Sequence, residues 1–242
     1  MSEWWQTFFD EDYLSVWTPA LGAERTESEA SGLAALLGLE PGMRVLDAPC
    51  GYGRLTRVLT DRGLDVLGVD ASETMIARAR QGTGRFLAQD LREPLEETGF
   101  DAAFNVFSSI GYAGEEGDRA VLRTIARALR GGGRFVLETL HRDPVVRRVA
   151  SGGPPGTLLP DGTLVVEELR FDPVAGRVET TWHWSGPHRH GSKTASFRMY
   201  AIPELVALLH DAGFRLLSVH DGLSTAPFVP TSPRVALLAE RA

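Results

Sequence analysis

A short apolar run that passes directly into a glycine-rich turn constrains the fold of this chain more than any other feature of its sequence. Residues 45–53 read VLDAPCGYG, so a strand-like run ends in Asp47 and the turn after it contains Gly51 and Gly53. Glycine lets a backbone approach a ligand closely and take angles that side chains forbid. In an open α/β sheet, ligands bind at the carboxyl ends of the strands. The turn therefore predicts an α/β fold with a ligand site at the end of this strand.

After this turn, strand-like and helix-like runs alternate along the chain. We expect strands over residues 44–48, 64–69, 85–88, 100–107 and 134–140, and helices over 53–62, after Ser72 and over 119–130. Such alternation is typical of parallel βαβ units with right-handed crossovers. The residues before the turn, over 2–35, have a mixed pattern that predicts helix.

The pattern then changes to three alternating runs joined by turn residues. Residues 163–171, 177–184 and 194–200 are expected to pair as antiparallel strands. A helix over 203–212 and strands over 214–220 and 234–239 follow them. The chain is therefore predicted to form an α/β domain with a small antiparallel β insertion before its last strands.

The composition excludes several classes of partner and site. The 242 residues carry a formal charge of −7 and no basic run, which disfavours long nucleic acids because their binding depends on clustered cations. A single cysteine, Cys50, excludes an internal disulfide and a multi-cysteine zinc site. Residues 1–10 lack the features of a signal peptide, and no apolar run approaches the ~20 residues that span a bilayer. We therefore expect a cytoplasmic protein without a membrane partner.

Three acids end three consecutive predicted strands: Asp47, Asp70 and Asp90. A carboxylate after one strand is usually a solvated loop residue, but three in sequence indicate one site at the same sheet edge. The sequence motif of dinucleotide-binding proteins has a third glycine at the position that Thr56 occupies here, and it does not need an acid such as Asp47 before its glycines. Both differences weaken the case for a nicotinamide cofactor. Asp47 favours a positively charged ligand, Asp70 can accept from both hydroxyls of a ribose, and Asp90 can accept from an adenine amino group.

These residues and their surroundings resemble the class I S-adenosylmethionine-dependent methyltransferase family over roughly residues 40–140 and 203–240. The resemblance rests on VLDAPCGYGR from Val45, LGVDAS from Leu67, QDL from Gln89, FDAAFNVF from Phe100, LRGGGRFVL from Leu129 and LLHDAGF from Leu208. It implies a Rossmann-like, doubly wound α/β fold with a seven-stranded, mostly parallel sheet whose last strand is antiparallel. It also implies S-adenosylmethionine as the methyl donor.

The resemblance further implies which residues hold the donor. The methionine part would lie among Asp47, Ala48, Gly51 and Gly53, and the nucleoside among Asp70, Ala71, Asp90 and Leu91, with Phe107 near the sulfonium. Tyr13 and Arg25 would cover the donor from an N-terminal lid, although aromatic helices are more often only packed. Pro49 stands where the family usually has the first glycine of this loop.

A general base is needed only if the acceptor must lose a proton before it attacks the methyl group. Candidates should follow the fourth and fifth strands, and we single out Tyr112 and His141, with Ser108 and Ser109 beside Tyr112. Histidine suits proton transfer near neutral pH, but a lone histidine after a strand is more often a solvated loop residue. If His141 is the base, His141→Ala should reduce turnover about 100-fold or more.

The β insertion is expected to select the acceptor. Four of its residues are candidates for an acceptor pocket: Trp182, Trp184, Arg198 and Tyr200. The two tryptophans share one face of a strand, so they either line the pocket or pack against the main sheet or a second subunit. The insertion's histidines, His183, His188 and His190, match no ligand spacing, so no metal site is expected. A short insertion over the site favours a small molecule as acceptor.

The chain is thus expected to be one methyltransferase domain over residues 1–242. Residues 1–38 would form the N-terminal helical lid, 40–140 and 201–242 the donor-binding core, and 155–200 the β insertion that caps the acceptor. The expected reaction is an in-line transfer of methyl to a nitrogen, oxygen or carbon atom. Two alternatives stay open: a Rossmann-type NAD-dependent oxidoreductase, and a protein that binds S-adenosylmethionine without transferring methyl. The expected assembly is a monomer or a homodimer.

Overall fold

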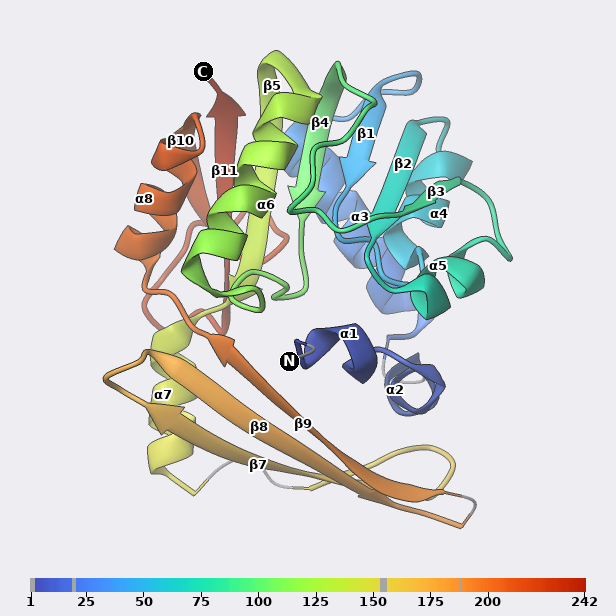
Figure 1. Ribbon diagram of the computed structural model, residues 1–242, viewed down its shortest axis with the longest axis vertical. Coiled ribbons are helices and arrows are strands. Elements are labelled where there is room, and N and C mark those ends of the chain that lie inside the picture. The colour runs from blue at the N-terminus through green and yellow to red at the C-terminus, as the bar shows by residue number, and fades with distance from the viewer. Residues whose placement is uncertain (1–2, 19–20, 153–155, 188) are drawn as a thin grey trace.

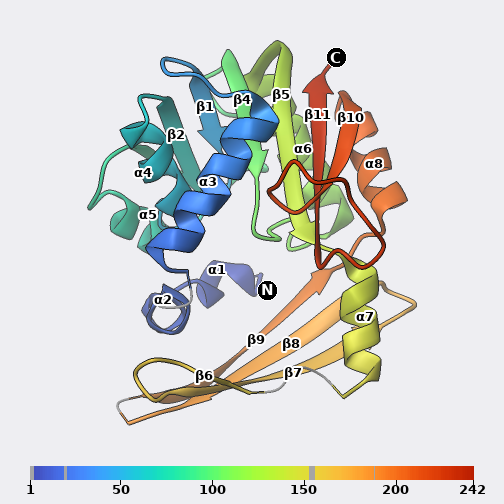
Figure 2. The same ribbon diagram turned by 180° about the vertical axis from the view of Figure 1, so that it is seen from behind.

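Two sheets with their covering helices form the part of the chain that the computed structural model describes, residues 3–18, 21–152, 156–187 and 189–242. The larger sheet lies between two layers of helices, and the smaller sheet lies beyond one end of it (Figure 1). The two short N-terminal helices lie between the sheets in both views (Figure 1, Figure 2).

The larger sheet has seven strands, whose order is β10-β11-β5-β4-β1-β2-β3. The strands are β1 (Arg44–Asp47), β2 (Asp65–Asp70), β3 (Arg85–Ala88), β4 (Phe100–Asn105), β5 (Leu129–Leu140), β10 (Phe214–Asp221) and β11 (Arg234–Arg241). β11 pairs antiparallel with both β10 and β5, whereas the other neighbours pair in parallel. The predicted fold class, a Rossmann-like and mostly parallel sheet with an antiparallel last strand, is confirmed.

Helices cover both faces of this sheet. They are α3 (Ala23–Leu37), α4 (Arg54–Asp61), α5 (Glu73–Ala79), α6 (Gly114–Ala128) and α8 (Ile202–Asp211). Buried residues of α3 and α4 pack against one face, and those of α6 and α8 pack against the other, because each helix presents an apolar stripe to strands that are apolar on both sides. Among the described residues, no helix is long and apolar enough to cross a membrane.

α7 (Arg142–Ala150) precedes the β insertion, which contains β6 (Thr157–Leu158), β7 (Leu164–Asp172), β8 (Arg177–Ser185) and β9 (His190–Arg198). β7, β8 and β9 pair antiparallel, as predicted for the three alternating runs, and β6, which was not predicted, pairs antiparallel with β7. α7 lies against this sheet, where Val145 packs with Val178 and Met199 (Figure 2).

The N-terminal region is divided into α1 (Trp5–Phe8), α2 (Glu11–Trp17) and α3, whereas the sequence predicts one helical run. The chain breaks at Asp10, whose carboxylate accepts from the Tyr13 N–H at 3.1 Å and so caps α2. A second break precedes α3, whose N-cap is Gly22, and α1 and α2 lie across the ends of the strands while α3 runs along the sheet (Figure 2).

Two further elements differ from the sequence prediction. α6 ends at Ala128 and β5 begins at Leu129, so Gly131–Gly133 lie within the strand and do not end the helix. The sequence prediction contains no element over the residues of α7. Pro144 lies in the first turn of α7, where its missing N–H costs no helical hydrogen bond.

Candidate active site

A cavity of about 590 Å³ opens at the carboxyl ends of β1, β2 and β4, and residues of the core, α1, α2 and the β insertion all line it. Its volume lies within the range of small-molecule sites, ~300–1,000 Å³. Nine of the residues predicted to hold the donor line this cavity: Tyr13, Arg25, Asp47, Gly51, Asp70, Ala71, Asp90, Leu91 and Phe107. The strand ends thus border a cavity where the glycine-rich turn predicts a ligand site.

Asp47 ends β1 with only 2% of its surface exposed. Thr56 Oγ1 donates a hydrogen bond of 2.6 Å to Asp47 Oδ2. Thr56, which occupies the third-glycine position of the dinucleotide-binding motif, therefore orients Asp47. Burial raises the pKa of Asp47 to about 7, because the charged form has lost its water and the Thr56 hydrogen bond offsets only part of that loss. A positively charged ligand beside Asp47 would restore the ionised form.

The raised pKa of Asp47 makes the stability of the ligand-free protein depend on pH. The folded state holds the Asp47 proton more tightly than the unfolded state, in which aspartate titrates near ~3.9. Stability should therefore fall as the pH rises from about 4 through about 7. Asp47→Asn removes this titration, so the variant should gain stability relative to the parent protein across that range. Chemical unfolding of both proteins at several pH values measures the difference, and a difference that stays constant with pH would contradict this reading.

Asp70 ends β2 beside the glycine-rich turn. Its Oδ2 accepts from the Gly51 N–H at 2.9 Å, and its Oδ1 accepts from the Ser72 N–H at 2.8 Å. Ser72 caps α5, so one carboxylate joins the turn after β1 to the helix after β2. Burial raises the pKa of Asp70 even though both backbone donors favour the ion. Each oxygen keeps a further lone pair that can accept from ligand hydroxyls.

Asp90 follows β3 and lines the cavity with Leu91, but its carboxylate is already engaged. Arg92 Nη2 and Nε donate to Asp90 Oδ2 at 2.6 and 3.0 Å. These hydrogen bonds hold the pKa of Asp90 below its usual range. Arg92 also pairs with Glu3 at 2.8 Å, which joins this edge of the core to the N-terminal segment. Sequence reasoning did not single out Arg92.

Phe107 lies after β4 in a left-handed conformation, with a φ angle of 67°. The chain leaves the sheet before this residue, whereas the sequence predicts a strand over 100–107. Three guanidinium groups lie 5.5–5.6 Å from the Phe107 ring centroid, those of Arg25, Arg54 and Arg234. Glu29 pairs with two of them, Arg25 and Arg54. This end of the cavity is therefore rich in cations, which suits a ligand carboxylate.

A buried ion pair supports the same loop. Glu138 of β5 is 3% exposed and accepts from the Phe107 N–H at 2.9 Å. Arg234, at the start of β11, donates to Glu138 Oε2 at 2.9 Å and to Ser108 Oγ at 3.0 Å. Arg234 also lines the cavity. Sequence reasoning missed this pair, because β5 and β11 meet only through their antiparallel pairing.

Two residues predicted to bind the donor, Ala48 and Gly53, do not line the cavity. Ala48 is fully buried in the core. Gly53 precedes α4 with a φ angle of 77°, and a Cβ built there would lie 2.6 Å from the Phe86 ring. Gly53 thus lets the turn pack closely against its neighbours, as its conformation and surroundings require glycine.

The structure separates the two predicted catalytic residues. Tyr112 lines the cavity, and its ring centroid lies 4.8 Å from that of Trp4. His141 precedes α7, with Nδ1 2.9 Å from the Ser232 carbonyl oxygen and its ring centroid 5.0 Å from that of Phe228. His141 is buried and is not among the residues that line the cavity.

His141→Ala is therefore expected to affect folding more than turnover. The substitution removes a buried hydrogen bond to Ser232 and the contact with Phe228, which should cost about 1–3 kcal/mol of stability. Turnover measured well below the melting temperature should stay close to that of the parent protein. A loss of about 100-fold in a variant of unchanged stability would return His141 to the role of base.

Of the two predicted acceptor residues on β8, one lines the cavity and the other does not. Trp182 lines the cavity and donates from Nε1 to Glu167 Oε1 at 3.0 Å. Trp184 lies further along the strand, where it is buried against Val16 and Leu159 and does not line the cavity. Trp182 thus lies in the cavity wall, whereas Trp184 packs against α2 and the insertion itself and not against the main sheet.

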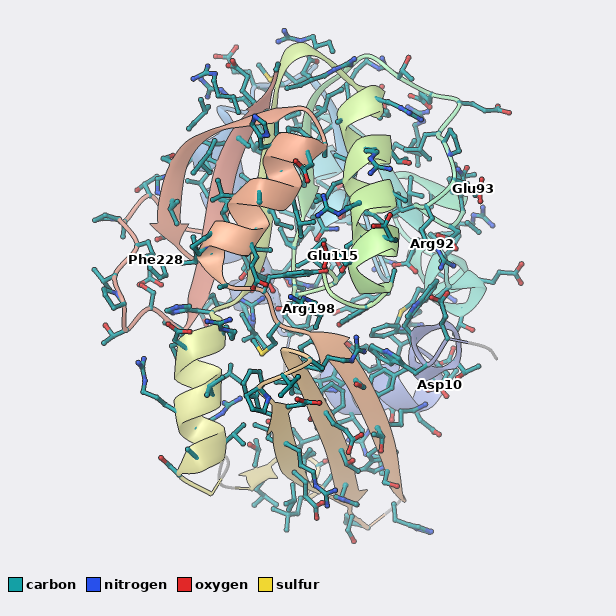
Figure 3. All side chains as sticks on the ribbon, turned by 60° about the vertical axis from the view of Figure 1, so that its left-hand side comes forward. Asp10, Arg92, Glu93, Glu115, Arg198 and Phe228 are labelled. Atoms are coloured by element: carbon teal, nitrogen blue, oxygen red, sulfur yellow. The ribbon has the colours of Figure 1, made fainter. Side chains whose placement is uncertain are left out.

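Arg198 ends β9 where the β insertion meets the core (Figure 3), and Tyr200 lies between β9 and α8. Arg198 Nη2 donates to Glu204 Oε1 at 2.7 Å, and the Tyr200 hydroxyl donates to Asp118 Oδ2 at 2.6 Å. Asp118 lines the cavity, and burial raises its pKa to about 6. Neither Arg198 nor Tyr200 lines the cavity, so both act in seating the insertion on the core.

The two described histidines of the insertion, His183 and His190, do not line the cavity. His183 Nε2 lies 3.7 Å from the exposed Glu168, His190 begins β9, and His188 lies outside the described residues. Within the part of the chain that the structure describes, no group of three or more His, Cys, Asp or Glu side chains could hold a metal ion.

Comparison with known sequences relates the chain to methyltransferases. A family model described as a methyltransferase domain matches residues 45–133. The chain is similar to the ubiquinone biosynthesis O-methyltransferase of Xanthomonas oryzae pv. oryzae (strain PXO99A), with 32% identity over 165 residues that cover 58% of this chain and 68% of that protein. The match to several other curated methyltransferases spans about half of their length.

Two solved structures share the fold over nearly the whole chain. The CcbJ methyltransferase from Streptomyces caelestis is 21% identical, with a TM-score of 0.81 over 98% of this chain and 99% of that chain. CalS10, an amino pentose methyltransferase from Micromonospora echinaspora solved with S-adenosylmethionine bound, is 21% identical, with a TM-score of 0.71 over 96% and 97% of the two chains. Each likeness extends to the β insertion as well as the core, because it spans the chain from end to end.

Proposed function

Since the chain belongs to the class I S-adenosylmethionine-dependent methyltransferases, we propose that it transfers the donor's methyl group to a small molecule in the cavity beneath the β insertion. The observation that carries this proposal is the pair of acids, Asp47 and Asp70, on either side of Gly51. Both line the cavity, and burial raises the pKa of both. A ligand that brings a positive charge and a pair of hydroxyl donors relieves both carboxylates, and S-adenosylmethionine brings both.

The cavity offers groups for each part of this donor. We assign the methionine part to Asp47 and Gly51, with Arg25 for its carboxylate and Phe107 near its sulfur, the ribose to Asp70, and the adenine to Ala71, Asp90 and Leu91. Arg92 fixes the orientation of Asp90, so this acid can accept only through the lone pairs that Arg92 leaves. Tyr13, which α2 places over the cavity, would cover the donor.

When bound, S-adenosylmethionine would supply a methyl group on a positively charged sulfur. A lone pair of the acceptor attacks this methyl carbon, and the neutral thioether S-adenosylhomocysteine leaves. The protein mainly has to hold the acceptor in line, and such alignment can lower a barrier by ~7–11 kcal/mol. Aromatic residues of α1 and α2 and Trp182 exclude water from this space. Burial raises the pKa of Tyr112, so its hydroxyl stays neutral and can orient an acceptor through a hydrogen bond.

The acceptor is proposed to be a small molecule. The similar proteins include an enzyme named for ubiquinone biosynthesis and one named for an amino pentose, which supports this class of acceptor. The cavity volume of about 590 Å³ suits the donor with one compact acceptor. A cytoplasmic location and a monomeric or dimeric state stay predictions of the sequence.

Transfer of labelled methyl tests the proposal. The protein is incubated with S-adenosylmethionine labelled in its methyl group and a panel of small amines, phenols, alcohols and carboxylic acids. We expect release of S-adenosylhomocysteine and labelling of one acceptor class. Donor binding without transfer to any class would favour the binding protein without catalysis. The NAD-dependent oxidoreductase is not favoured, because Thr56 occupies the position of the third glycine in the dinucleotide-binding motif and donates a hydrogen bond to Asp47.

A further inference from the structure

The inner face of the β insertion places one carboxylate in the wall of the cavity. Glu167 of β7 lines the cavity together with Thr180 and Trp182 of β8. Side chains alternate between the two faces of a strand, so its neighbours Val166 and Glu168 are on the other face and are exposed. An acid on an apolar face that borders a cavity requires a physical reason, because a carboxylate loses hydration there.

Two hydrogen bonds fix the position of this acid. Glu167 Oε1 accepts from Thr180 Oγ1 and from Trp182 Nε1, each at 3.0 Å. Oε2 has no hydrogen-bond partner within the described residues. Glu167, Trp182 and Lys193 lie in one row across β7, β8 and β9, yet Lys193 pairs with Asp10 at 2.7 Å. Lys193 Nζ also lies 5.6 Å from the Phe8 ring centroid, so Asp10 and Phe8 hold the cation of this row, and Glu167 lines the cavity without pairing to it.

Aromatic rings border this carboxylate. The ring centroid of Trp182 lies 4.7 Å from that of Trp17 and 5.3 Å from that of Phe8, and all three residues line the cavity. The faces of such rings attract ammonium groups. The buried indole N–H of Trp17 has no hydrogen-bond partner among the described residues, so it is free to donate to a ligand oxygen.

We propose that the methyl acceptor carries an amine, which binds as an ammonium group between Glu167 and the rings of Trp182 and Trp17, beside a hydroxyl or carbonyl oxygen that accepts from Trp17. This inference rests on the proposed function, since it concerns the acceptor end of the same cavity. A carboxylate framed by aromatic faces attracts cations and repels carboxylates and phosphates. Glu167 thus determines which class of acceptor enters.

A matched pair of probes tests this assignment. Choline carries an ammonium group and a hydroxyl, and 3,3-dimethylbutan-1-ol has the same shape without the charge. Their binding to the full chain, with and without S-adenosylhomocysteine, is measured by the quenching of tryptophan fluorescence. We expect choline to bind about 10-fold more tightly or better than the neutral compound.

Glu167→Gln should reduce this preference severalfold, to the part that the aromatic rings alone provide. Its amide oxygen can still accept from Thr180 and Trp182, so the substitution removes the charge and keeps the shape. Glu168→Gln, on the exposed face of the same strand, should keep the full preference. The affinity for S-adenosylhomocysteine should not change in either variant.

Equal binding of the two probes by the parent protein, absence of choline binding included, overturns the inference whatever the variants do. A Glu167→Gln protein that folds and keeps the full preference overturns it as well. Failure of the proposed function gives a different result, namely no binding of S-adenosylhomocysteine to the parent protein.

Discussion

Asp70→Ala should weaken the binding of S-adenosylhomocysteine by about 100-fold or more. In our assignment the Asp70 carboxylate accepts from both ribose hydroxyls, and each hydrogen bond to a charged group is worth about 1.5–3 kcal/mol. Losing two of them exceeds the ~2.8 kcal/mol that corresponds to a factor of 100. Isothermal titration calorimetry of the purified protein measures the change.

Two companion variants make this result specific. Asp65→Ala removes an acid at the start of the same strand, where Asp65 pairs with Arg85 at the surface, so it should leave the affinity unchanged. Asp70→Asn keeps an oxygen that accepts from Gly51 or Ser72, so its affinity should lie between those of the parent protein and Asp70→Ala. A folded Asp70→Ala protein with the parent's affinity would refute the ribose assignment.

Arg234→Leu should lower the free energy of unfolding by about 3–5 kcal/mol. Removal of one partner of a buried ion pair leaves an uncompensated charge, here the Glu138 carboxylate, which is 3% exposed. The same change removes the hydrogen bond to Ser108 beside Phe107, so the loop after β4 also loses support. Urea unfolding followed by circular dichroism measures the loss.

The double variant Arg234→Leu/Glu138→Leu distinguishes the cost of an unpaired buried charge from the cost of losing the other contacts of Arg234. Without either charge, stability should recover most of the loss, since well-packed apolar residues often replace a buried pair at little cost. Arg215→Ala breaks an exposed pair with Glu240 and should cost about 0–1 kcal/mol. A loss below about 1 kcal/mol in Arg234→Leu would mean that water reaches Glu138 and that the pair does not support this loop.

The part of the site made by consecutive strand ends could be predicted from the sequence. Asp47, Asp70 and Asp90 follow neighbouring strands of a parallel sheet, and the carboxyl ends of parallel strands meet at one edge. Acids at the ends of these consecutive strands therefore lie close together in the folded protein. The same local logic predicted the glycine-rich turn, although Gly53 serves packing and not the cavity wall.

The part of the site made by pairing between distant strands could not be predicted in this way. Glu138 and Arg234 meet through the pairing of β5 with β11, and Glu167 faces Trp182 through the pairing of β7 with β8. Which residues of two distant strands face each other depends on turn geometry and on which face of the sheet is buried. No local sequence motif predicts this register.

Side-chain direction also limited the prediction for His141. The sequence shows a histidine directly after the fifth strand, which favours a position at the sheet edge. The chain turns there into α7, and the His141 ring packs toward Ser232 and Phe228 instead of the cavity. The sequence prediction contains no helix after the fifth strand, so the direction of the chain after β5 was not apparent.

The ligand preference of the purified protein tests the central claim most directly. Calorimetric titrations with S-adenosylhomocysteine and with NAD, under the same conditions, compare the two ligands that a turn of this kind can serve. The site built on Asp47, Thr56 and Asp70 predicts binding of S-adenosylhomocysteine with one molecule per chain and no binding of NAD. Tight binding of NAD with no binding of S-adenosylhomocysteine would contradict it.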